Sequence, residues 1–262
     1  MIEFKSVSLS FDGRPILENI SFTLKAGETM VILGGSGSGK TTILRLILGL
    51  IHPDLGDILI EGRSIVDLSE QEMTEIRAMM ALVFQHAALF DSLTVRENVG
   101  YRFWEKDVLD DEEIEQRVIE SLRFVGLDDI TNAMPAELSG GMRKRVAIAR
   151  AVASNPRVIL YDEPTAGLDP INTHIISGLI RRLQTKERVT QVVVTHDIDT
   201  AYHVSDHLIM IQRGEKIFEG PVSALKSSKD QRVQGFLNPH DGLAHKDESF
   251  GLPPEITKEL PR

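Results

Sequence analysis

Cysteine is absent from this sequence of 262 residues, so disulfide bonds and thiolate metal ligands are excluded. Long apolar runs are absent as well, because no stretch approaches the roughly 20 residues that an α-helix needs to cross a bilayer. The first residues, Met1 to Lys5, lack the charged-then-apolar pattern of a secretory signal. We therefore expect a chain that is soluble by itself and reaches a membrane only through a partner.

Positive charge is scarce. The chain carries 29 Lys and Arg residues against 39 Asp and Glu residues, which gives a formal net charge of −10. This balance argues against nucleic acid as a partner, because non-specific binding to nucleic acid depends on basic surface. The length and the 42% hydrophobic content are ordinary for a folded protein with one large domain, or one domain with an added lobe.

Hydrophobic patterning predicts an α/β fold. Residues 1–33 alternate between apolar and polar positions, which is typical of antiparallel strands, except that Met30–Leu33 is continuously apolar and predicts a buried central strand. Residues 90–150 look mainly helical and predict a separate helical lobe, while residues 208–219 predict a closing hairpin. Alternation of strands with helices implies a mostly parallel sheet. The remaining buried-type strands are expected at 82–85, 158–161 and 192–195.

Capping signals mark several helix starts. Ser69 and Glu72 have the spacing of a capping box, and Asp110 opens a helix of the lobe in a similar way. Asp169, followed by proline, opens a third helix. That helix is expected to carry Ile171, Ile175, Leu179 and Leu183.

The run from Gly34 to Thr41 has the pattern G-x-x-x-x-G-K-T between a buried strand and a helix, which is the context this phosphate-binding motif requires. Glycines let backbone N–H groups turn inward around phosphates. Lys40 can reach the β- and γ-phosphates, and the Thr41 hydroxyl can bind Mg²⁺. Thr42 is expected near the α-phosphate. The predicted nucleotide-binding residues are Gly34, Gly35, Ser36, Gly37, Ser38, Gly39, Lys40, Thr41 and Thr42.

Acidic and polar side chains follow other buried strands. Asp162 is placed to hold Mg²⁺ through water, and Glu163 is placed to orient and deprotonate the attacking water. Gln85 ends a strand, and its amide can contact Mg²⁺ or that water. His196 ends another strand and can contact the γ-phosphate. Taken alone, a glutamine or a histidine in such a place is more often structural, so both assignments depend on the whole constellation.

Leu138–Met142 reads Leu-Ser-Gly-Gly-Met and predicts a second anion-binding turn, because Ser139, Gly140 and Gly141 precede a helix expected to start at Met142. Two phosphate-binding devices in one chain suggest a nucleotide held between two copies. Asp169 is then a helix cap, a contact across the dimer interface, or both. Phe11 either stacks on adenine or belongs to the core.

Together these motifs resemble the ATP-binding subunits of ABC transporters over about residues 1–225. The resemblance implies a P-loop NTPase fold of the ABC type with an N-terminal antiparallel β subdomain. It also implies a head-to-tail homodimer, in which each ATP lies between one phosphate loop and the other subunit's Ser139–Gly141 turn. Met142 stands where the family usually has glutamine, and Phe11 where tyrosine is common. Neither position supplies an obligatory charge, so we expect both departures to be compatible with ATP hydrolysis.

A narrower resemblance lies in Phe84–Val99, which, with Met142, is similar to the MlaF-like subunits of bacterial phospholipid transporters and the related chloroplast lipid importers. It implies an ATPase that energises phospholipid transport through separate integral membrane permease subunits, at the cytoplasmic face of the inner membrane. An MCE-domain lipid-binding protein is the further partner it implies. In this family the same stretch receives the permease's coupling helix; the alternative is that residues 88–90 are lobe core.

Two other functions stay open. One is an ABC ATPase for another cargo, such as an amino acid, a metal chelate or a drug. The other is a relative that acts on ribosomes or DNA, although those usually carry two ATP-binding units or a long coiled-coil insertion. We expect the ATP-binding domain to span residues 1–226. The polar residues 227–262 form either a loose tail or a docking arm, with Phe236–Leu237 and Phe250–Leu252 as apolar anchors.

Overall fold

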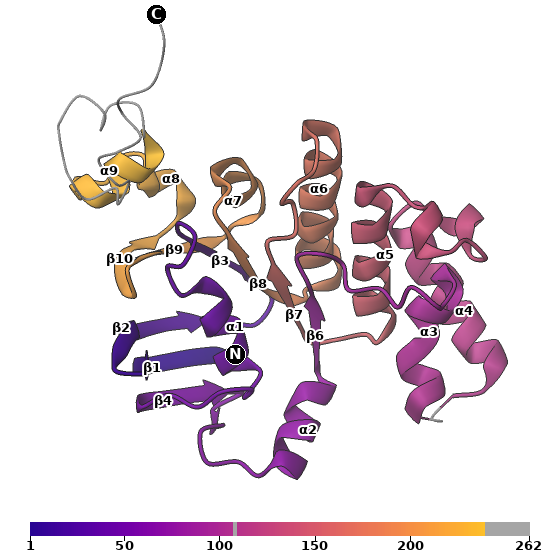
Figure 1. Ribbon diagram of the computed structural model, residues 1–262, viewed down its shortest axis with the longest axis horizontal. Helices are drawn as coiled ribbons and strands as arrows, with labels where there is room; N and C mark the ends of the chain where they lie inside the picture. The colour runs from indigo at the N-terminus through magenta and orange to yellow at the C-terminus, as the bar shows by residue number, and fades with distance from the viewer. Residues whose placement is uncertain (107–108, 239–262) are drawn as a thin grey trace, which may run out of the picture.

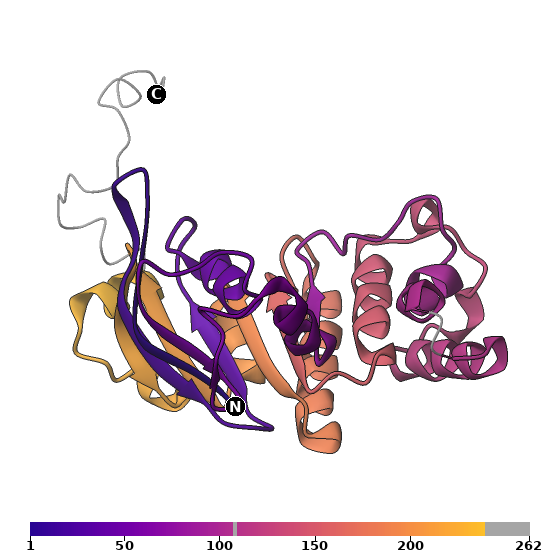
Figure 2. The same cartoon turned by 90° about the horizontal axis from the view of Figure 1, so that it is seen from below.

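A computed structural model of the protein describes residues 1–106 and 109–238. It places a small antiparallel sheet beside a larger, mostly parallel sheet, with a helical lobe on the far side of the larger one (Figure 1). The same order is visible from below in Figure 2. The predicted α/β class, with an antiparallel N-terminal subdomain and a helical lobe, is confirmed.

The smaller sheet has the strand order β2-β1-β4-β5, and all its neighbours are antiparallel. Its strands are β1 (Ile2–Phe11), β2 (Arg14–Leu24), β4 (Leu55–Ile60) and β5 (Arg63–Ser64). Alternate side chains such as Ile2 and Phe4 are buried, and Phe4 stacks on Phe22 of the neighbouring strand. The period-two pattern of the first 24 residues thus gives one buried face.

The larger sheet has the order β10-β9-β3-β8-β7-β6, in which only β10 is antiparallel to its neighbour. Its strands are β3 (Thr29–Leu33), β6 (Met80–Val83), β7 (Val158–Asp162), β8 (Thr190–Thr195), β9 (His207–Gln212) and β10 (Glu215–Gly220). The predicted central strand and closing hairpin are therefore confirmed. Because the parallel strands share one direction, the loops after β3, β6, β7 and β8 meet at one edge of the sheet.

Helices cover both faces of the larger sheet. On β3, Met30 and Ile32 belong to a core with the small sheet and α1 (Lys40–Ile47), whereas Val31 and Leu33 belong to the core on the helical side. That second core contains the buried faces of α6 (Pro170–Glu187) and α7 (Ile198–Val204). Burial on both faces explains why the central strands are continuously apolar.

The lobe contains α3 (Val95–Lys106), α4 (Asp111–Phe124) and α5 (Gly140–Ala153), with short 3₁₀ turns at Asp128–Ile130 and Pro135–Glu137. The Asp110 side chain accepts a hydrogen bond from the Glu113 amide at 2.9 Å, so the predicted cap is present. Outside the lobe, α2 (Glu70–Ala78) begins with the predicted capping box of Ser69 and Glu72. These local signals were sufficient to place the helix starts.

Two details of the sequence prediction are wrong. Gln85 does not end a strand, because β6 ends at Val83 and the chain then turns. The helix after the Ser-Gly-Gly turn begins at Gly140 rather than at Met142, since Ser139 is already the cap. On α6, Leu179 and Leu183 are buried, but Ile171 is 75% exposed and Ile175 is exposed as well. The helix extends beyond the sheet at that end, so its first apolar residues are left uncovered.

The chain continues after β10 into α8 (Val222–Leu225) and α9 (Gln231–Leu237). Val233 is fully buried, and Phe236 and Leu237 pack against the helical-side core. The first part of the predicted tail is therefore docked on the chain's own core. The rest of that segment, including Phe250–Leu252, lies outside the described residues. No helix in the described ranges is long and apolar enough to cross a membrane.

Candidate nucleotide site

The loop between β3 and α1 has glycines where the backbone demands them. A Cβ on Gly34 would overlap the main-chain oxygen of Ile211, and a Cβ on Gly39 would come within 2.7 Å of Leu17. Gly37 and Gly39 also have positive φ angles of 74° and 104°, which side chains other than glycine rarely adopt. By contrast, a Cβ on Gly35 or Gly37 would meet nothing within 4 Å. One side of the loop is thus closely packed, and the other is open to a ligand.

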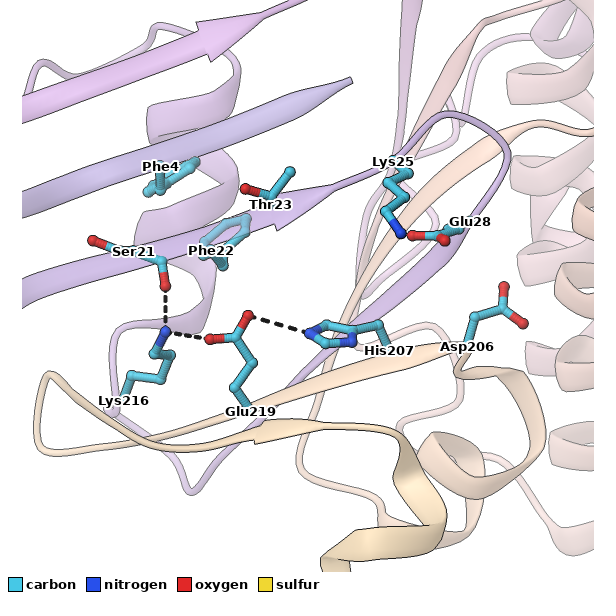
Figure 3. Close-up of a pocket in the computed structure, with 10 residues that line it drawn as sticks. All are labelled: Phe4, Ser21, Phe22, Thr23, Lys25, Glu28, Asp206, His207, Lys216 and Glu219. Carbon is cyan, nitrogen blue, oxygen red and sulfur yellow. Dashed lines mark hydrogen bonds and ion pairs between the residues drawn. The ribbon is translucent and has the colours of Figure 1, made fainter.

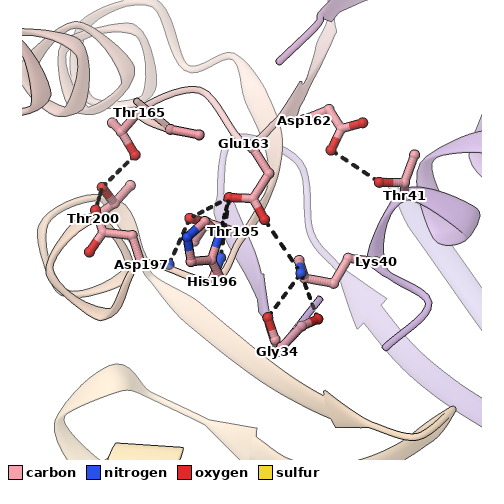
Figure 4. Close-up of polar contacts among 12 residues, drawn as sticks. Gly34, Lys40, Thr41, Asp162, Glu163, Thr165, Thr195, His196, Asp197 and Thr200 are labelled. Carbon is pink, nitrogen blue, oxygen red and sulfur yellow. Dashed lines mark hydrogen bonds and ion pairs between the residues drawn. The ribbon is translucent and has the colours of Figure 1, made fainter. Parts of the chain in front are cut away.

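Lys40 lies inside this loop. Its side chain is 8% exposed, and Nζ donates hydrogen bonds to the carbonyl oxygens of Gly34 at 2.9 Å and Gly35 at 3.0 Å (Figure 4). Nζ also lies 3.4 Å from Oε1 of Glu163. The ammonium group is therefore held at the mouth of the phosphate loop by groups that an anionic phosphate can replace.

Both the main chain and the carboxylate of Glu163 are constrained by their neighbours. Its φ of 48° is left-handed, a conformation that a non-glycine residue keeps only where its surroundings enforce it. Oε2 accepts hydrogen bonds from Thr195 Oγ1 at 3.2 Å and from the His196 amide at 3.3 Å, and lies 2.9 Å from His196 Nδ1. The sequence predicted Lys40, Glu163 and His196 as site residues, and the fold brings all three together.

Asp162 and Thr41 form the second predicted pair. The Thr41 hydroxyl donates to Asp162 Oδ1 at 3.2 Å. Burial raises the pKa of the Asp162 carboxyl above its usual value, and the hydrogen bond from Thr41 offsets part of that rise. A half-buried carboxylate beside a hydroxyl is a place where a cation is stabilising.

The residues present fit Mg²⁺ only in combination with a nucleotide. In residues 1–106 and 109–238 there is no group of three or more His, Cys, Asp or Glu side chains that could hold a metal ion. Mg²⁺ is commonly bound by one or two protein oxygens together with substrate phosphates and water. Asp162 and Thr41 would supply the protein oxygens, and the phosphate loop faces the same space.

Two predicted residues lie apart from this cluster. Gln85 is exposed, two residues beyond β6, and its side chain makes no hydrogen bond within the described part of the chain. Phe11 is 44% exposed at the end of β1, where it pairs with Arg14. The following residues of β2 pack against Gly39, so the Phe11 hairpin lies next to the phosphate loop without closing over it. Thr42 is half-buried in the first turn of α1.

The Leu138–Met142 turn forms the start of α5, and part of it is exposed. Ser139 caps α5 and accepts a hydrogen bond from the Met142 amide at 3.2 Å, and both Ser139 and Gly140 are exposed. Gly141 is buried against Asn172, which the side chain of Asp169 holds at the start of α6. In Figures 1 and 2, α5 and α1 lie in separate parts of the molecule. The turn therefore does not serve the phosphate loop of its own chain.

Comparison with known proteins identifies the family. The sequence pattern described as ABC transporter matches residues 17–166. The chain belongs to the ABC transporter family. The MlaF ATP-binding protein of the intermembrane phospholipid transport system of Escherichia coli K12 is 38% identical, over 97% of this chain and 93% of MlaF. The mkl protein of Mycobacterium leprae, whose name describes a ribonucleotide transport ATP-binding protein, is 38% identical over 95% of this chain and 73% of its own length.

A solved structure agrees with both fold and nucleotide. The dimeric, post-hydrolysis state of the ATP-binding cassette MJ0796, bound to ADP and Pi, has a TM-score of 0.78 and 36% identity, over 85% of this chain and 99% of that one. This ABC subunit is accordingly a nucleotide-binding ATPase, as the sequence predicted.

Sequence analysis missed several residues of the ABC site. Thr195 holds Glu163, and Thr165 and Thr200 hydrogen-bond at 2.9 Å below the loop that follows β7. Lys144 is buried on α5 and bonded to that same loop. One signal was available for Lys144, because it falls on the stripe that α5 buries. That stripe is Gly141, Lys144, Ile148 and Ala151.

A cavity of about 420 Å³ lies elsewhere in this ABC subunit (Figure 3). It opens between β2 and the β9–β10 hairpin, and none of the predicted nucleotide residues lines it. Three of its side chains form one polar cluster: Lys216 donates to Glu219 and to the Ser21 carbonyl, and His207 Nε2 lies 3.3 Å from Glu219. This cavity is therefore separate from the nucleotide site.

Proposed function

We propose that the chain energises phospholipid transport through separate integral membrane permease subunits. The coverage of the relatives carries this proposal. The chain matches the E. coli phospholipid transport protein over nearly the whole of both sequences. By contrast, about a quarter of the mkl sequence lies outside the match with this chain. The two relatives are equally identical to this chain, so identity alone favours neither cargo. Ribonucleotide is the competing cargo that the experiment below must exclude.

The proposed chemistry uses the groups already in place. Asp162 and Thr41 would hold Mg²⁺, and the ion would neutralise part of the phosphate charge. When phosphate draws Lys40 away, Glu163 loses its cationic neighbour and stands ready to accept the proton of the attacking water. His196 lies beside that carboxylate and contacts the γ-phosphate. Gln85, whose side chain is exposed, completes this arrangement only if that side chain reaches the bound nucleotide.

We further propose that two copies share each ATP. The exposed Ser139 and Gly140 lie apart from their own phosphate loop, so a second chain must supply the phosphate they bind. MJ0796 is dimeric with bound nucleotide, which supports the same arrangement here. ATP binding then draws the two chains together, and hydrolysis releases them. Asp169 serves as helix cap and as part of this interface, and Phe11 stacks on adenine.

The permease is proposed to dock on an exposed aromatic surface formed by Phe90 and Tyr101. These side chains are 44% and 39% exposed, and their rings lie 4.6 Å apart. Exposed aromatic residues in contact with one another are typical of interfaces. Docking there places the chain at the cytoplasmic face of the inner membrane, with an MCE-domain lipid-binding protein as a further component of the complex.

The loop that carries this surface is held rigidly. Buried Asn98 bonds to the carbonyl oxygens of Phe90, Leu93 and Thr94 at 2.9–3.1 Å and accepts from the Phe90 amide at 2.8 Å. The Arg150 guanidinium donates to the carbonyls of Ala87 and Ala88, both at 2.8 Å. A fixed loop loses little conformational entropy on binding, which favours docking.

The experiment is reconstitution of the full chain with its permease in phospholipid vesicles. We expect ATP-dependent transfer of a labelled phospholipid, and no transfer when the complex carries Glu163→Gln. ATP-dependent uptake of a labelled ribonucleotide, without phospholipid transfer, would assign the competing cargo and overturn the proposal.

A further inference from the structure

Lys144 is a buried lysine that has no role in the proposed chemistry of the nucleotide site. It lies on α5, five residues after Ser139, and only 8% of it is exposed. Its Nζ donates hydrogen bonds to the carbonyl oxygens of Glu163 at 3.2 Å and of Ala166 at 2.8 Å. The side chain thus reaches from the helix of the Ser-Gly-Gly turn to the loop that carries Glu163.

The two carbonyls belong to one tight turn after β7. The Ala166 amide donates to the Glu163 carbonyl at 3.2 Å, so that oxygen accepts from both the turn and Lys144. Glu163 itself has the left-handed φ of 48°. Such a conformation persists only where the surroundings over-determine it. Lys144 supplies part of that constraint, because its two hydrogen bonds hold the carbonyl groups at both ends of the turn.

Burial of the charged amine makes lysine energetically unfavourable at this position. Burial lowers the pKa of Lys144 to about 8, and the nearby Glu163 carboxylate offsets part of the effect. An apolar side chain of similar length would fill the same space without desolvating a charge. The space alone therefore does not account for the lysine, whereas its hydrogen bonds to two main-chain oxygens do.

We propose that Lys144 is a positioning residue that sets the main-chain geometry of Glu163 from the helix of the Ser-Gly-Gly turn. The inference rests on the proposed role of Glu163 as base and on the proposed dimer. In that dimer, α5 contacts the ATP bound by the other chain. A shift of α5 on closure is then passed through Lys144 to the base of its own site, so the state of one ATP site adjusts the chemistry of the other.

The test compares Lys144→Met with the wild-type full chain in steady-state ATP hydrolysis. We expect kcat to fall by about 10- to 100-fold, because small misplacements of a catalytic group have effects of that size. KM and the affinity for ATP should stay within about twofold, since Lys40 and Thr41 are untouched. Lys186→Met, the same substitution at an exposed position of α6, is the matched control with unchanged kcat and KM.

Chemical rescue separates the amine from the shape of the side chain. Because the chain has no cysteine, Lys144→Cys introduces a single thiol. Alkylation in denaturant with 2-bromoethylamine, followed by refolding, rebuilds an amine at the length of lysine, and alkylation with iodoethane gives a similar shape without the amine. We expect the aminoethyl form to recover most of the wild-type kcat and the ethyl form to stay defective.

Three results would overturn the inference: wild-type kcat in Lys144→Met, equal kcat in the two alkylated forms, or a rise in KM that accounts for the whole loss. If Lys144→Met does not fold, the two alkylated forms decide by themselves. A wild-type chain that does not hydrolyse ATP would instead count against the proposed function. If the wild type and the Lys144 variants all hydrolyse ATP at the same rate, only the role given to Lys144 is wrong, and the proposed function stands.

Discussion

At the scale of single residues, Lys40 and Glu163 form an ion pair inside the nucleotide site. Both side chains are largely buried, and their closest atoms lie 3.4 Å apart. A buried pair of this kind is neutral as a unit, but either partner alone is costly. In the proposed mechanism, phosphate replaces Glu163 as the partner of Lys40, so nucleotide binding would also release the proposed base. His196 and Thr195 keep the carboxylate in place when this happens.

Lys144 gives a prediction about stability and pH. Burial lowers its pKa from 10.5 in the ordinary lysine to about 8 in the folded chain. Below pH 8 the amine is charged in both states. Between about pH 8 and 10.5 the unfolded chain holds a proton that the folded chain has released, so the free energy of unfolding rises with pH in this window.

The measurement is urea denaturation of the wild type and Lys144→Met at several pH values from 7 to about 10. The difference in unfolding free energy, wild type minus variant, should increase with pH, because the other titrating groups are common to both proteins. A difference that stays flat or decreases would show that Lys144 keeps its proton in the folded chain.

At the level of elements, the contact between α5 and α6 depends on Gly141. A Cβ there would overlap the side chain of Asn172, which two hydrogen bonds to Asp169 hold in place. The helix that carries the Ser-Gly-Gly turn is thereby fixed to the cap of the helix after Glu163. The two loops of the proposed interface are therefore packed against each other.

Gly141→Ala is expected to lower the free energy of unfolding by about 1–3 kcal/mol, the usual cost of overpacking. Gly178→Ala is the matched control on the exposed side of α6, where an added Cβ meets nothing within 4 Å. It should raise stability by about 0.5–1 kcal/mol, because alanine favours the helix. Thermal or urea unfolding of both variants measures this, and equal effects of the two substitutions would contradict the role given to Gly141.

The elements also indicate what sequence could and could not predict. The phosphate loop and the caps at Ser69, Asp110 and Asp169 were predictable, because their signals lie within a few residues of one another. The position of Gln85 was not, since the end of β6 is set by pairing with β7. Lys144 was missed for the same reason, because its partners lie 19 and 22 residues away in sequence. The packing of α9 likewise depends on a core formed by the rest of the chain.

At the scale of the whole molecule, the proposed dimer divides each ATP site between two chains. The phosphate loop, Glu163 and Asp162 would form one half, and the exposed Ser139 and Gly140 would form the other. A single chain would then hold nucleotide from one side only, and a second copy would supply the missing side. The proposed docking surface at Phe90 and Tyr101 lies on the lobe that this closure would move.

The most direct test is the mass of the full chain carrying Glu163→Gln in the presence of Mg²⁺ and ATP, by size-exclusion chromatography with light scattering. A matched variant adds Gly140→Trp at an exposed glycine, where a Cβ would meet only Leu168, at 3.9 Å. The account predicts twice the chain mass of 29.2 kDa for Glu163→Gln and the single mass for the variant with the added tryptophan. A single mass for both at saturating ATP, or the doubled mass for both, would contradict it.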